Sequence, residues 1–340
     1  MTRRTFLQKT GQVMLALGLM PLLPHNWQRA MANPISSPIA GAYFPSGTKP
    51  PTNASFKALI FADSQCAHSS YQVWKDTLAA GWHQCPEAAF FADLGDLADN
   101  GEAEWQWEGF LDALAPYAAR HPFVPVMGNH ECYGLDWKNC LPRNYLEAFT
   151  FPGNGTTNFH GYFYSFRYGP VDFIVLNTQM LELDEFFGQG ALLKAQIDWL
   201  KNREKKNLPW TVVLMHKDIL AYDEYQPNQD STYGFSDAGR ALLPILEEIG
   251  VDLILTGHMH TYRRRGPLQN FQTSASGIHC IMSGPAGDQT YTVPADPLDK
   301  ASLSQPTEPN YLILEASPQK LTVTCCTASG RQADKLTLEK

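Results

Sequence analysis

Residues 90–101, FFADLGDLADNG, contain the end of an apolar run followed by a turn rich in carboxylates. Ala88 to Leu94 has the length of a buried strand. Gly95 permits a sharp exit from that strand, so Asp96 is presented at its carboxyl end. Ligands of open α/β sheets gather at the carboxyl ends of the strands. The stretch therefore predicts a strand that delivers Asp96 to a metal or phosphate site, although an ordinary solvated turn also favours Gly-Asp and Asp-Asn pairs.

The same alternation of strand, polar turn and helix occurs along most of the chain. Strands are expected at 56–62, 123–127, 210–215 and 251–255, an aromatic hairpin at 162–176, and further strands near 277–283, 310–316 and 321–327. Helices are expected at 68–82, 103–117, 191–205 and 235–249. Strands that alternate with helices indicate a largely parallel, buried sheet. Because both halves of the chain are rich in strands, we expect two stacked sheets with helices outside.

The first 32 residues have the features of an export signal. Arg3 and Arg4 precede the apolar run Val13 to Leu23, which is shorter than the roughly 20 residues that a membrane-spanning helix needs. Ala30-Met31-Ala32 fits a small-x-small cleavage site. The arginine pair followed by Phe6-Leu7 resembles a twin-arginine signal, while a general secretory signal or a retained anchor would be the alternatives. We expect the twin-arginine export machinery as a partner, a periplasmic or secreted location, and no stable membrane span after cleavage.

Composition limits the organisation and the partners of the remaining chain. Residues 33–55 are rich in Pro, Ser, Gly and Thr and predict an extended leader, followed by one domain at 56–330 and a C-terminal tail at 331–340. The net charge of the full chain is −8, and the export signal at residues 1–32 contains basic but no acidic residues. The mature chain is therefore more acidic than the full chain, which argues against nucleic acid as a partner. Of the seven cysteines, Cys132 and Cys140 are the likeliest local disulfide in an oxidising compartment.

One strand after another ends in a side chain that can bind a metal ion. These residues are Asp63, Asp96, Asn129, His216, His258 and His260. Each alone would be an ordinary turn residue more often than a ligand, but six coincidences favour a common site. Carboxylate, amide and imidazole donors together suit Zn, Mn or Fe. Two such ions about 3.5–4 Å apart can stabilise the attacking and leaving oxygens of an in-line displacement, and a carboxylate shared between them offsets their repulsion.

Five motifs in this order resemble the calcineurin-like metallophosphoesterases, the broad group that includes the purple acid phosphatases. They are Asp63-x-Gln65, Gly95-Asp96-x-x-Asp99, Gly128-Asn129-His130-Glu131, His216, and Gly257-His258-x-His260. The resemblance covers about residues 63–262 and implies a four-layer α/β/β/α sandwich of two mixed sheets. It also implies two divalent or mixed-valence transition-metal ions, Fe, Mn or Zn.

The resemblance also assigns roles to individual residues. Asp96 would bridge both ions; Asp63 and His260 would hold the first, and Asn129, His216 and His258 the second. His130 would contact the phosphate and protonate the leaving oxygen or orient the water, a role that suits a group with a near-neutral pKa. Together, His130 and Asp96 are the expected catalytic residues.

Two positions depart from the family pattern. Gln65 stands where the family often has a histidine ligand, so it either ligates weakly through its amide oxygen or only binds metal-bound water. Asp99 stands where purple acid phosphatases carry the tyrosine behind their colour, so a purple iron(III) protein is not expected; Asp99 either orients a metal-binding histidine or closes the turn. Arg263 could clamp phosphate or belong to a solvated run after a strand, and Tyr222 could line the substrate pocket.

These observations favour a metal-dependent hydrolase of small phosphate esters, with phosphomonoesters first, in which a metal-bound hydroxide attacks phosphorus. The same site could instead serve diesters, nucleotides or pyrophosphate bonds, because a fold does not determine its substrate. The alternative of another class is a non-catalytic module that binds a phosphorylated ligand or a protein partner, with Gln65 weakening one metal site.

Overall fold

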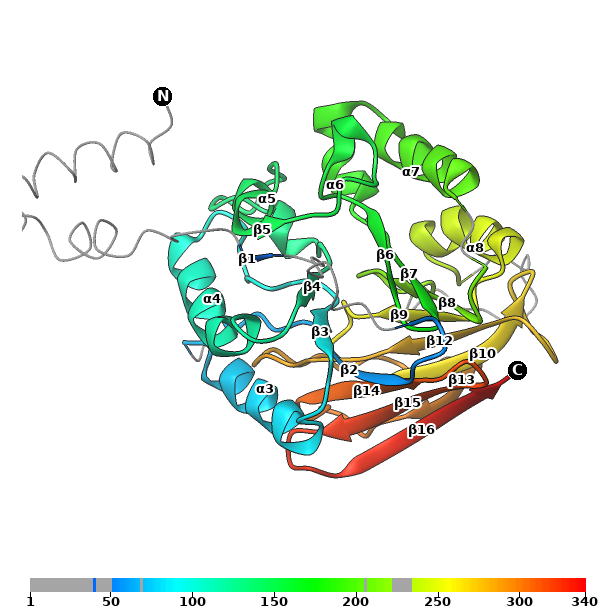
Figure 1. Ribbon diagram of the computed structural model, residues 1–340. Coiled ribbons are helices and arrows are strands. Elements are labelled where there is room, and N and C mark those ends of the chain that lie inside the picture. Colours follow the sequence, from blue (N-terminus) through cyan, green and yellow to red (C-terminus); the bar gives the residue numbers. More distant parts are fainter. Residues whose placement is uncertain (1–38, 41–50, 68–69, 205–206, 222–233) are drawn as a thin grey trace, which may run out of the picture. The chain divides into compact units, whose positions relative to one another are not determined.

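The computed structural model describes residues 39–40, 51–67, 70–204, 207–221 and 234–340 (Figure 1). The chain divides into two units, Met1–Pro38 and Ile39–Lys340. The first unit, with the export signal expected at 1–32, lies outside the described residues, so that signal stays a prediction. All structural findings below concern the second unit. None of the helices in its described part is long and apolar enough to cross a membrane.

The strand expected at 88–94 is β3 (Phe90–Asp93), a central strand of a six-stranded mixed sheet. Its parallel neighbours are β2 (Phe56–Phe61) and β4 (Phe123–Pro125). Beyond β2 the sheet continues with antiparallel strands, in the order β14 (Asn310–Ala316), β15 (Lys320–Thr327) and β16 (Gln332–Glu339). The carboxyl ends of β2, β3 and β4 therefore lie at one edge of this sheet.

An eight-stranded mixed sheet contains the later strands. Four of them run parallel in the order β7, β8, β9, β12, and antiparallel strands extend both sides, giving the path β11-β10-β12-β9-β8-β7-β6 with β13 on β10. The strands are β6 (Tyr164–Tyr168), β7 (Val171–Val175), β8 (Trp210–Leu214), β9 (Leu253–Thr256), β10 (Arg263–Gln269), β11 (Gln272–Thr273), β12 (Ile278–Met282) and β13 (Asp299–Ser302).

The alternation of side chains along β2 and β3 explains how the layers pack. Phe56, Ala58 and Ile60 belong to the apolar core between the two sheets, while Leu59 and Phe61 belong to the core beneath the helices. Successive side chains of a strand point to opposite faces, so the uninterrupted apolar run at residues 58–61 of β2 must be covered on both sides. The continuous apolar run therefore requires a sheet on one face and helices on the other.

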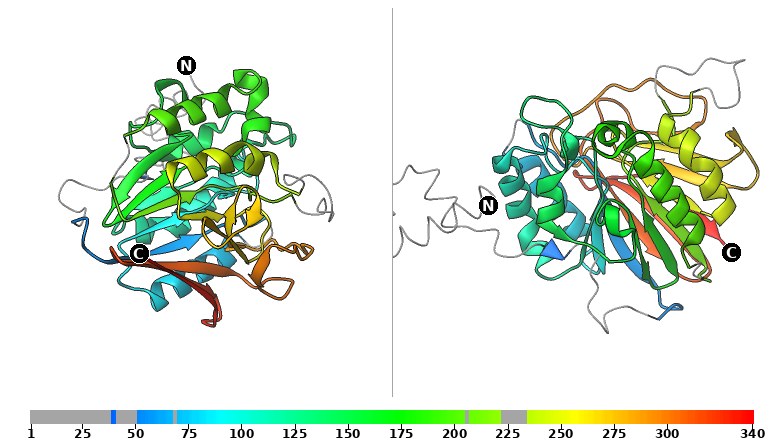
Figure 2. Two further views of the ribbon diagram at one scale, coloured as in Figure 1. Left: turned by 90° about the vertical axis from the view of Figure 1, so that its right-hand side faces the viewer. Right: turned by 90° about the horizontal axis from the view of Figure 1, so that it is seen from above.

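The helices cover the outer faces of both sheets (Figure 2). Over the six-stranded sheet, Trp74 of α3 packs against Phe61 and stacks on Phe110 of α4. The second sheet is covered by α7 and α8. The helices are α3 (Gln72–Gln84), α4 (Glu104–Ala118), α5 (Arg143–Ala148), α6 (Met180–Phe187), α7 (Ala191–Asn202) and α8 (Asp237–Ile249). The expected four-layer α/β/β/α architecture of two mixed sheets is confirmed.

Local sequence explains where α8 begins and ends. The hydroxyl of Ser236 accepts a hydrogen bond from the backbone N–H of Gly239, which caps the first turn. At the other end Gly250 adopts the left-handed conformation that commonly terminates helices. The helix turns Leu242, Leu243 and Leu246 into the core. Four short elements complete the described structure: β1 (Ile39–Ala40), its partner strand β5 (Phe149–Thr150), and the 3₁₀ turns His130–Cys132 and Thr157–Phe159.

Two expectations about the chain's ends and cysteines are wrong. Residues 331–340 are not a tail, because Gln332–Glu339 form β16 and pair with β15 along its whole length. Strict apolar alternation is absent from β16 because it is an edge strand with one partner, which is why the sequence pattern was weak there. Cys132 and Cys140 do not form a disulfide; both are free thiols, joined only by a backbone hydrogen bond from Cys140 N–H to the Cys132 carbonyl.

Candidate metal centre

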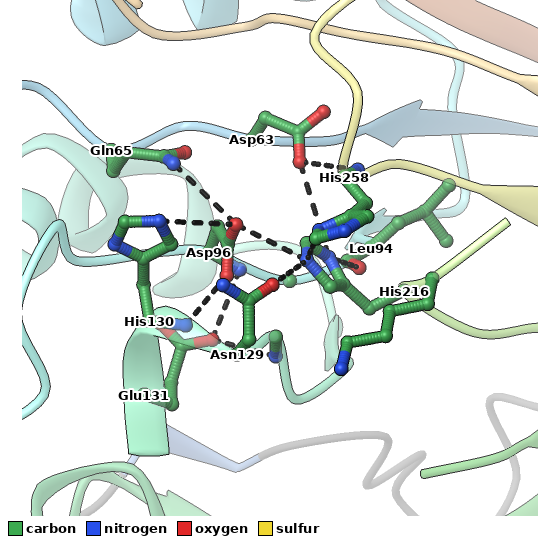
Figure 3. A network of polar contacts seen from close by, with 12 residues as sticks. Asp63, Gln65, Leu94, Asp96, Asn129, His130, Glu131, His216 and His258 are labelled. Atoms are coloured by element: carbon green, nitrogen blue, oxygen red, sulfur yellow. Dashed lines mark hydrogen bonds and ion pairs between the residues drawn. The ribbon is translucent and has the colours of Figure 1, made fainter. Parts of the chain in front are cut away.

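The polar residues that follow five strands meet at one place between the two sheets. Asp63, Asp96 and Asn129 follow β2, β3 and β4 of the six-stranded sheet. His216 and the pair His258 and His260 follow β8 and β9 of the eight-stranded sheet. Figure 3 shows side chains from both sheets converging on Asp96. Because parallel strands present their carboxyl ends at one edge, two such edges facing each other can enclose a ligand from both sides.

The converging side chains form two groups that could hold metal ions, and Asp96 belongs to both. In each group the donor atoms lie within 4.8 Å of one another. We call them the first cluster, made of Asp63, Asp96 and His260, and the second cluster, made of Asp96, His216 and His258. A buried carboxylate common to two donor sets is the arrangement expected of a ligand that bridges two cations.

The second cluster is tightly convergent around Nε2 of His216. This atom lies 3.0 Å from Oδ1 of Asn129, 3.1 Å from Oδ2 of Asp96 and 3.2 Å from Nδ1 of His258. Four candidate donors thus lie close together, and Asn129 joins the second cluster as its amide ligand. The number and type of donors fit a transition-metal ion such as Zn, Mn or Fe.

Backbone carbonyls determine which nitrogen each of two histidines presents to the site. Nδ1 of His216 lies 2.9 Å from the Leu94 carbonyl, and Nδ1 of His260 lies 2.8 Å from the Gln289 carbonyl. A carbonyl only accepts hydrogen bonds, so both Nδ1 atoms carry the proton. Each ring therefore offers Nε2 as its free donor, which is the usual way in which neighbouring groups orient a metal-binding histidine.

Four of the candidate ligands have backbone conformations that side chains other than glycine rarely adopt. The φ angles are 54° for Asp63, 58° for Asp96, 80° for His258 and 48° for His260. Such conformations are costly and persist where the surroundings enforce them. One enforcing contact is the hydrogen bond from the backbone N–H of His258 to Oδ1 of Asp63, at 2.7 Å. The concentration of strain at these residues supports their choice as candidate ligands.

Close backbone approach also requires glycine beside Asp96. A Cβ atom on Gly128 would lie 2.1 Å from Oδ1 of Asp96 and 2.3 Å from its backbone nitrogen. No side chain tolerates such distances, so the glycine in the motif 128–131 is required by packing. Because Gly128 has no side chain, the loop that follows β4 can lie directly against Asp96 in the loop that follows β3.

Gln65 occupies a place in the first cluster. Its Nε2 lies 3.3 Å from Nε2 of His260 and 3.5 Å from Oδ2 of Asp96, and its Oε1 is buried without a hydrogen-bond partner in the structure. Exchange of the two amide atoms by a half-turn would bring Oε1 to the same position, where it could bind a metal ion. The geometry therefore brings Gln65 to the first cluster and leaves both expected roles, ligand or partner of bound water, open.

His130 lies beside the shared ligand. Its backbone N–H donates to Oδ1 of Asp96 at 3.0 Å, and its Nδ1 donates to the Asp99 carbonyl at 2.6 Å. Its Nε2 lies 4.0 Å from Oδ2 of Asp96. Burial opposes the charged ring, but the Asp96 carboxylate and the Asp99 carbonyl outweigh it and raise the pKa of His130. A protonated ring would direct its Nε2–H toward the metal clusters.

Asp99 supports this histidine rather than a metal ion. Besides the carbonyl contact, its Oδ1 lies 3.7 Å from Nδ1 of His130. The side chain of Gln289 donates to the same oxygen of Asp99. Since the Gln289 carbonyl also accepts from His260, one residue holds both the first cluster and the His130 support in place. Gln289 was not expected from sequence, because it lies 190 residues from Asp99 in a loop without a motif.

Glu131 is the second residue whose role the sequence did not show. Its buried carboxylate accepts hydrogen bonds from the backbone N–H groups of Asp96, Leu97, Ala98 and Gly128, at 2.7–3.2 Å. It thus holds the loop that carries the shared ligand. Burial and the nearby Asp96 carboxylate raise the pKa of Glu131 to about 7. A buried acid directly after the motif's histidine was the available signal, since such a residue needs several donors.

The electrostatics of the two clusters favour bound cations. Burial, together with the Asp96 carboxylate, raises the pKa of Asp63 to about 7, and Oδ2 of Asp63 is buried without a partner in the structure. Burial alone would also raise the pKa of Asp96, but His216 and His130 hold it below its usual range. Burial and the adjacent His216 lower the pKa of His258 far below its usual range, so this ring is a neutral donor. Burial also lowers the pKa of His260 to about 4. The neutral rings of His258 and His260, the unpartnered carboxylate oxygen and the shared carboxylate fit a pair of metal ions.

A family model described as calcineurin-like phosphoesterase matches residues 56–262, more than half of the chain. The chain belongs to the calcineurin-like phosphoesterase family. The matched region begins at β2 and ends just after His260, so it contains every strand end that contributes to the two clusters. The resemblance inferred from the five motifs is confirmed at the level of the family.

The relatives of this calcineurin-like phosphoesterase include acid phosphatases. It is 25% identical over 195 residues to purple acid phosphatase 18 of Arabidopsis thaliana, covering 57% of this chain and 43% of the relative. It is 28% identical over 227 residues to human acid phosphatase type 7, and the match covers 59% of this chain and 48% of the relative. The matches thus span less than half the length of these curated relatives.

A solved structure shows the same fold. The purple acid phosphatase PPD1 from yellow lupin (Lupinus luteus) seeds matches with a TM-score of 0.67 and 21% identity, covering 86% of this chain and 55% of that one. The likeness extends beyond the family model, because the match includes strands that follow residue 262. It supports the two-sheet architecture described above.

Two further residues were expected near the substrate, Arg263 and Tyr222. Arg263 is not in a solvated run: it begins β10, is buried, and its guanidinium donates to the Val293 carbonyl at 2.8 Å and lies 3.6 Å from Asp299. These partners indicate a structural contact, and a role toward phosphate stays a prediction. Tyr222 lies outside the described residues, so its expected place in the pocket stays a prediction as well.

Proposed function

We propose that this calcineurin-like phosphoesterase hydrolyses small phosphate esters, phosphomonoesters first, with two ions of Fe, Mn or Zn bound to the first and second clusters. The observation that carries the proposal is the shared carboxylate: Asp96 lies in both donor groups, buried between two sheets. Two ions held there would polarise the phosphoryl oxygens and lower the pKa of water. The preference for monoesters is supported by the relatives, which are named as acid phosphatases.

The chain's own residues would perform two tasks in this reaction. The two clusters would hold the ions, whose positive charge would attract the phosphate to the carboxyl ends of both sheets, where burial strengthens each electrostatic contact. Water's oxygen forms a new bond to phosphorus in line with the bond to the leaving oxygen, which breaks. His130 would give its Nε2 proton to the leaving oxygen, and the attacking water would lose one proton to the solvent, so the products are an alcohol and inorganic phosphate.

The hydrogen bonds around His130 prepare it for this role. Its Nδ1 is held by the Asp99 carbonyl at 2.6 Å, which leaves Nε2 as the mobile proton. The raised pKa of His130 favours the protonated ring near neutral pH. A positioned acid of this kind is worth about 10²–10⁴ in rate.

A turnover assay on the full-length chain tests the proposal. The protein is reconstituted with Mn, Zn or Fe and given 4-nitrophenyl phosphate and bis(4-nitrophenyl) phosphate, with Asp96→Asn as the control. Monoester turnover that the control lacks supports the proposal. Faster diester turnover would replace the monoesterase with a phosphodiesterase. No turnover with any metal, together with one ion or none per chain, would favour the non-catalytic binding module.

We further propose that the chain reaches the periplasm or the exterior through the twin-arginine pathway. The support is the sequence of residues 1–32 alone, with its Arg3-Arg4 pair, short apolar run and Ala-Met-Ala site. Arg3→Lys with Arg4→Lys should retain the protein in the cytoplasmic fraction of a host that has this pathway. Unchanged export of that variant would favour a general secretory signal.

A further inference from the structure

Three aromatic side chains lie beside the metal clusters, and two of them are open to solvent. Trp137 is 57% exposed and its ring centroid lies 6.1 Å from that of His130, edge to face at 89°. The ring centroid of Tyr133 lies 5.4 Å from that of His130 and 6.3 Å from that of Trp137. Tyr291 is 40% exposed and stacks on the ring of His260 at 4.2 Å and 28°. We call Tyr133, Trp137 and Tyr291 the aromatic rim.

The backbone holds Trp137 in this position at a cost. Its φ angle is 61°, a left-handed conformation that is rare for a bulky residue. The turn is closed by hydrogen bonds from Trp137 N–H to the Gly134 carbonyl and from Gly134 N–H to the Lys138 carbonyl, both at 2.8 Å. Tyr133 and Asn139 form an isolated bridge at its base. The turn thus enforces a strained conformation that presents a large apolar ring to solvent beside His130.

The other side of the rim comes from a different part of the chain. Tyr291 follows Gln289, whose carbonyl accepts the Nδ1 proton of His260 and whose side chain donates to Asp99. The loop that carries Tyr291 is therefore tied to the first cluster and to the support of His130. Two loops, from residues 133–139 and 289–291, thus place aromatic rings against the candidate acid and against a candidate ligand.

We infer that the aromatic rim selects phosphate esters whose leaving alcohol carries a planar aromatic ring. This inference rests on the proposed function, in which His130 protonates the leaving oxygen. That oxygen must then lie within hydrogen-bonding distance of Nε2 of His130, so a ring one or two bonds away reaches the exposed ring of Trp137. Flat rings stack on Trp and Tyr faces, and a planar ring makes this contact better than a saturated one of equal size. Trp137 is a specificity-determining residue of the site.

The test compares ligands that differ only in aromaticity. Benzylphosphonate and cyclohexylmethylphosphonate carry the same charge and similar volume, and neither can be hydrolysed at its P–C bond by this chemistry. Calorimetric titration of the full-length, Mn-loaded protein should show benzylphosphonate binding about three- to tenfold more tightly. Trp137→Leu should bring the ratio close to one. Trp105→Leu, which alters an equally exposed tryptophan at the start of α4, should leave the ratio unchanged.

The outcomes separate this inference from the proposed function. Equal binding of the two phosphonates to the native protein would overturn the inference, and so would a ratio that Trp137→Leu does not change. Neither result bears on turnover, which the assay with 4-nitrophenyl phosphate measures. Conversely, an aromatic preference that depends on Trp137 in a protein without turnover would support the rim and reject the hydrolase. Benzyl phosphate and cyclohexylmethyl phosphate as substrates should differ in KM rather than in kcat, because stacking acts alike on the bound substrate and the transition state.

Discussion

The two clusters share one carboxylate but differ in how completely they are built. In the second cluster, Asn129, Asp96 and His258 all lie within 3.0–3.2 Å of one nitrogen of His216. In the first cluster, Gln65 stands where a histidine is common in the family, and its amide lies 3.3 Å from His260. Amide oxygen is a weaker donor than imidazole for Zn, Mn or Fe. From this difference we expect the ion of the first cluster to be held less strongly than that of the second, so the two halves should respond differently to the same change.

Removal of the bridge should have the largest effect, because it affects both halves. Asp96→Asn keeps the shape of the side chain and a hydrogen-bond acceptor for His130, but it removes the charge between the clusters. We expect loss of both ions on gel filtration in metal-free buffer and a fall in turnover of at least about 10⁴-fold, since metal activation and bridging fail together. A variant that retains two ions would show that the clusters are independent.

Loss of the proton donor His130 should reduce turnover and leave the metal content of both clusters unchanged. His130→Ala removes the proton donor beside Asp96 and should lower kcat by about 10²–10⁴-fold. Metal content, measured by mass spectrometry of the purified protein, should stay at the native value. Matched loss of turnover and metal would mean that His130 supports the clusters rather than the reaction.

Single-ligand variants should show which half binds more strongly. His260→Ala weakens the first cluster and His216→Ala weakens the second, so each should reduce the metal content to about one ion. Because the second cluster has two imidazoles and its donors lie closer together, the ion that survives in His260→Ala should dissociate more slowly in the presence of a chelator. Equal rates from the two variants would remove the distinction between the halves.

A histidine at position 65 should reduce the difference in metal affinity between the two clusters. Gln65→His introduces imidazole at a buried position that already lies beside Asp96 and His260. We expect the affinity of the weaker ion to rise about tenfold in competition with a chelator, with the stronger ion unaffected. A fall in affinity would contradict this prediction. It would indicate that the pocket fits the side chain of Gln65 and not the histidine, which differs from it in length.

The smallest expected effect is a difference between the two clusters in how their metal affinity depends on pH. Binding to the first cluster displaces the proton of Asp63, whose pKa burial raises to about 7. At His216 burial opposes the charge, but Asp96 and Asp63 outweigh it and raise the pKa to about 9, so the second cluster releases a proton there. As pH rises, the affinity of the first cluster should level off near pH 7 and that of the second near pH 9. Titrations of His258→Ala and His260→Ala, which leave one cluster each, measure both profiles; identical profiles would contradict these assignments.

The path from sequence to site depended on strand ends. Asp63, Asp96, Asn129, His216, His258 and His260 were expected to meet because each follows an apolar run that reads as a buried strand, and the structure brings all six together. Their binding of metal stays a prediction. Glu131 and Gln289 were not given roles. The partners of Glu131 are backbone N–H groups, which a residue pattern does not show, and Gln289 reaches the side chains of Asp99 and His260 from a loop without a motif. The edge strand β16 was missed because an edge carries no continuous apolar run.

The sequence by itself determined the order of strands and helices, the apolar faces that require two stacked layers, and the donor residues at the strand ends. These follow from local periodicity, from the chemistry of carboxylate, amide and imidazole, and from glycines that permit sharp turns. The tertiary structure decided which donors share an ion, that Asp96 lies in both clusters, and that Arg263 is buried in β10 rather than solvated. It also decided that Trp137 and Tyr291, more than 150 residues apart, both lie against the site. Such distances depend on how two sheets pack, and packing is a property of the whole chain rather than of any segment.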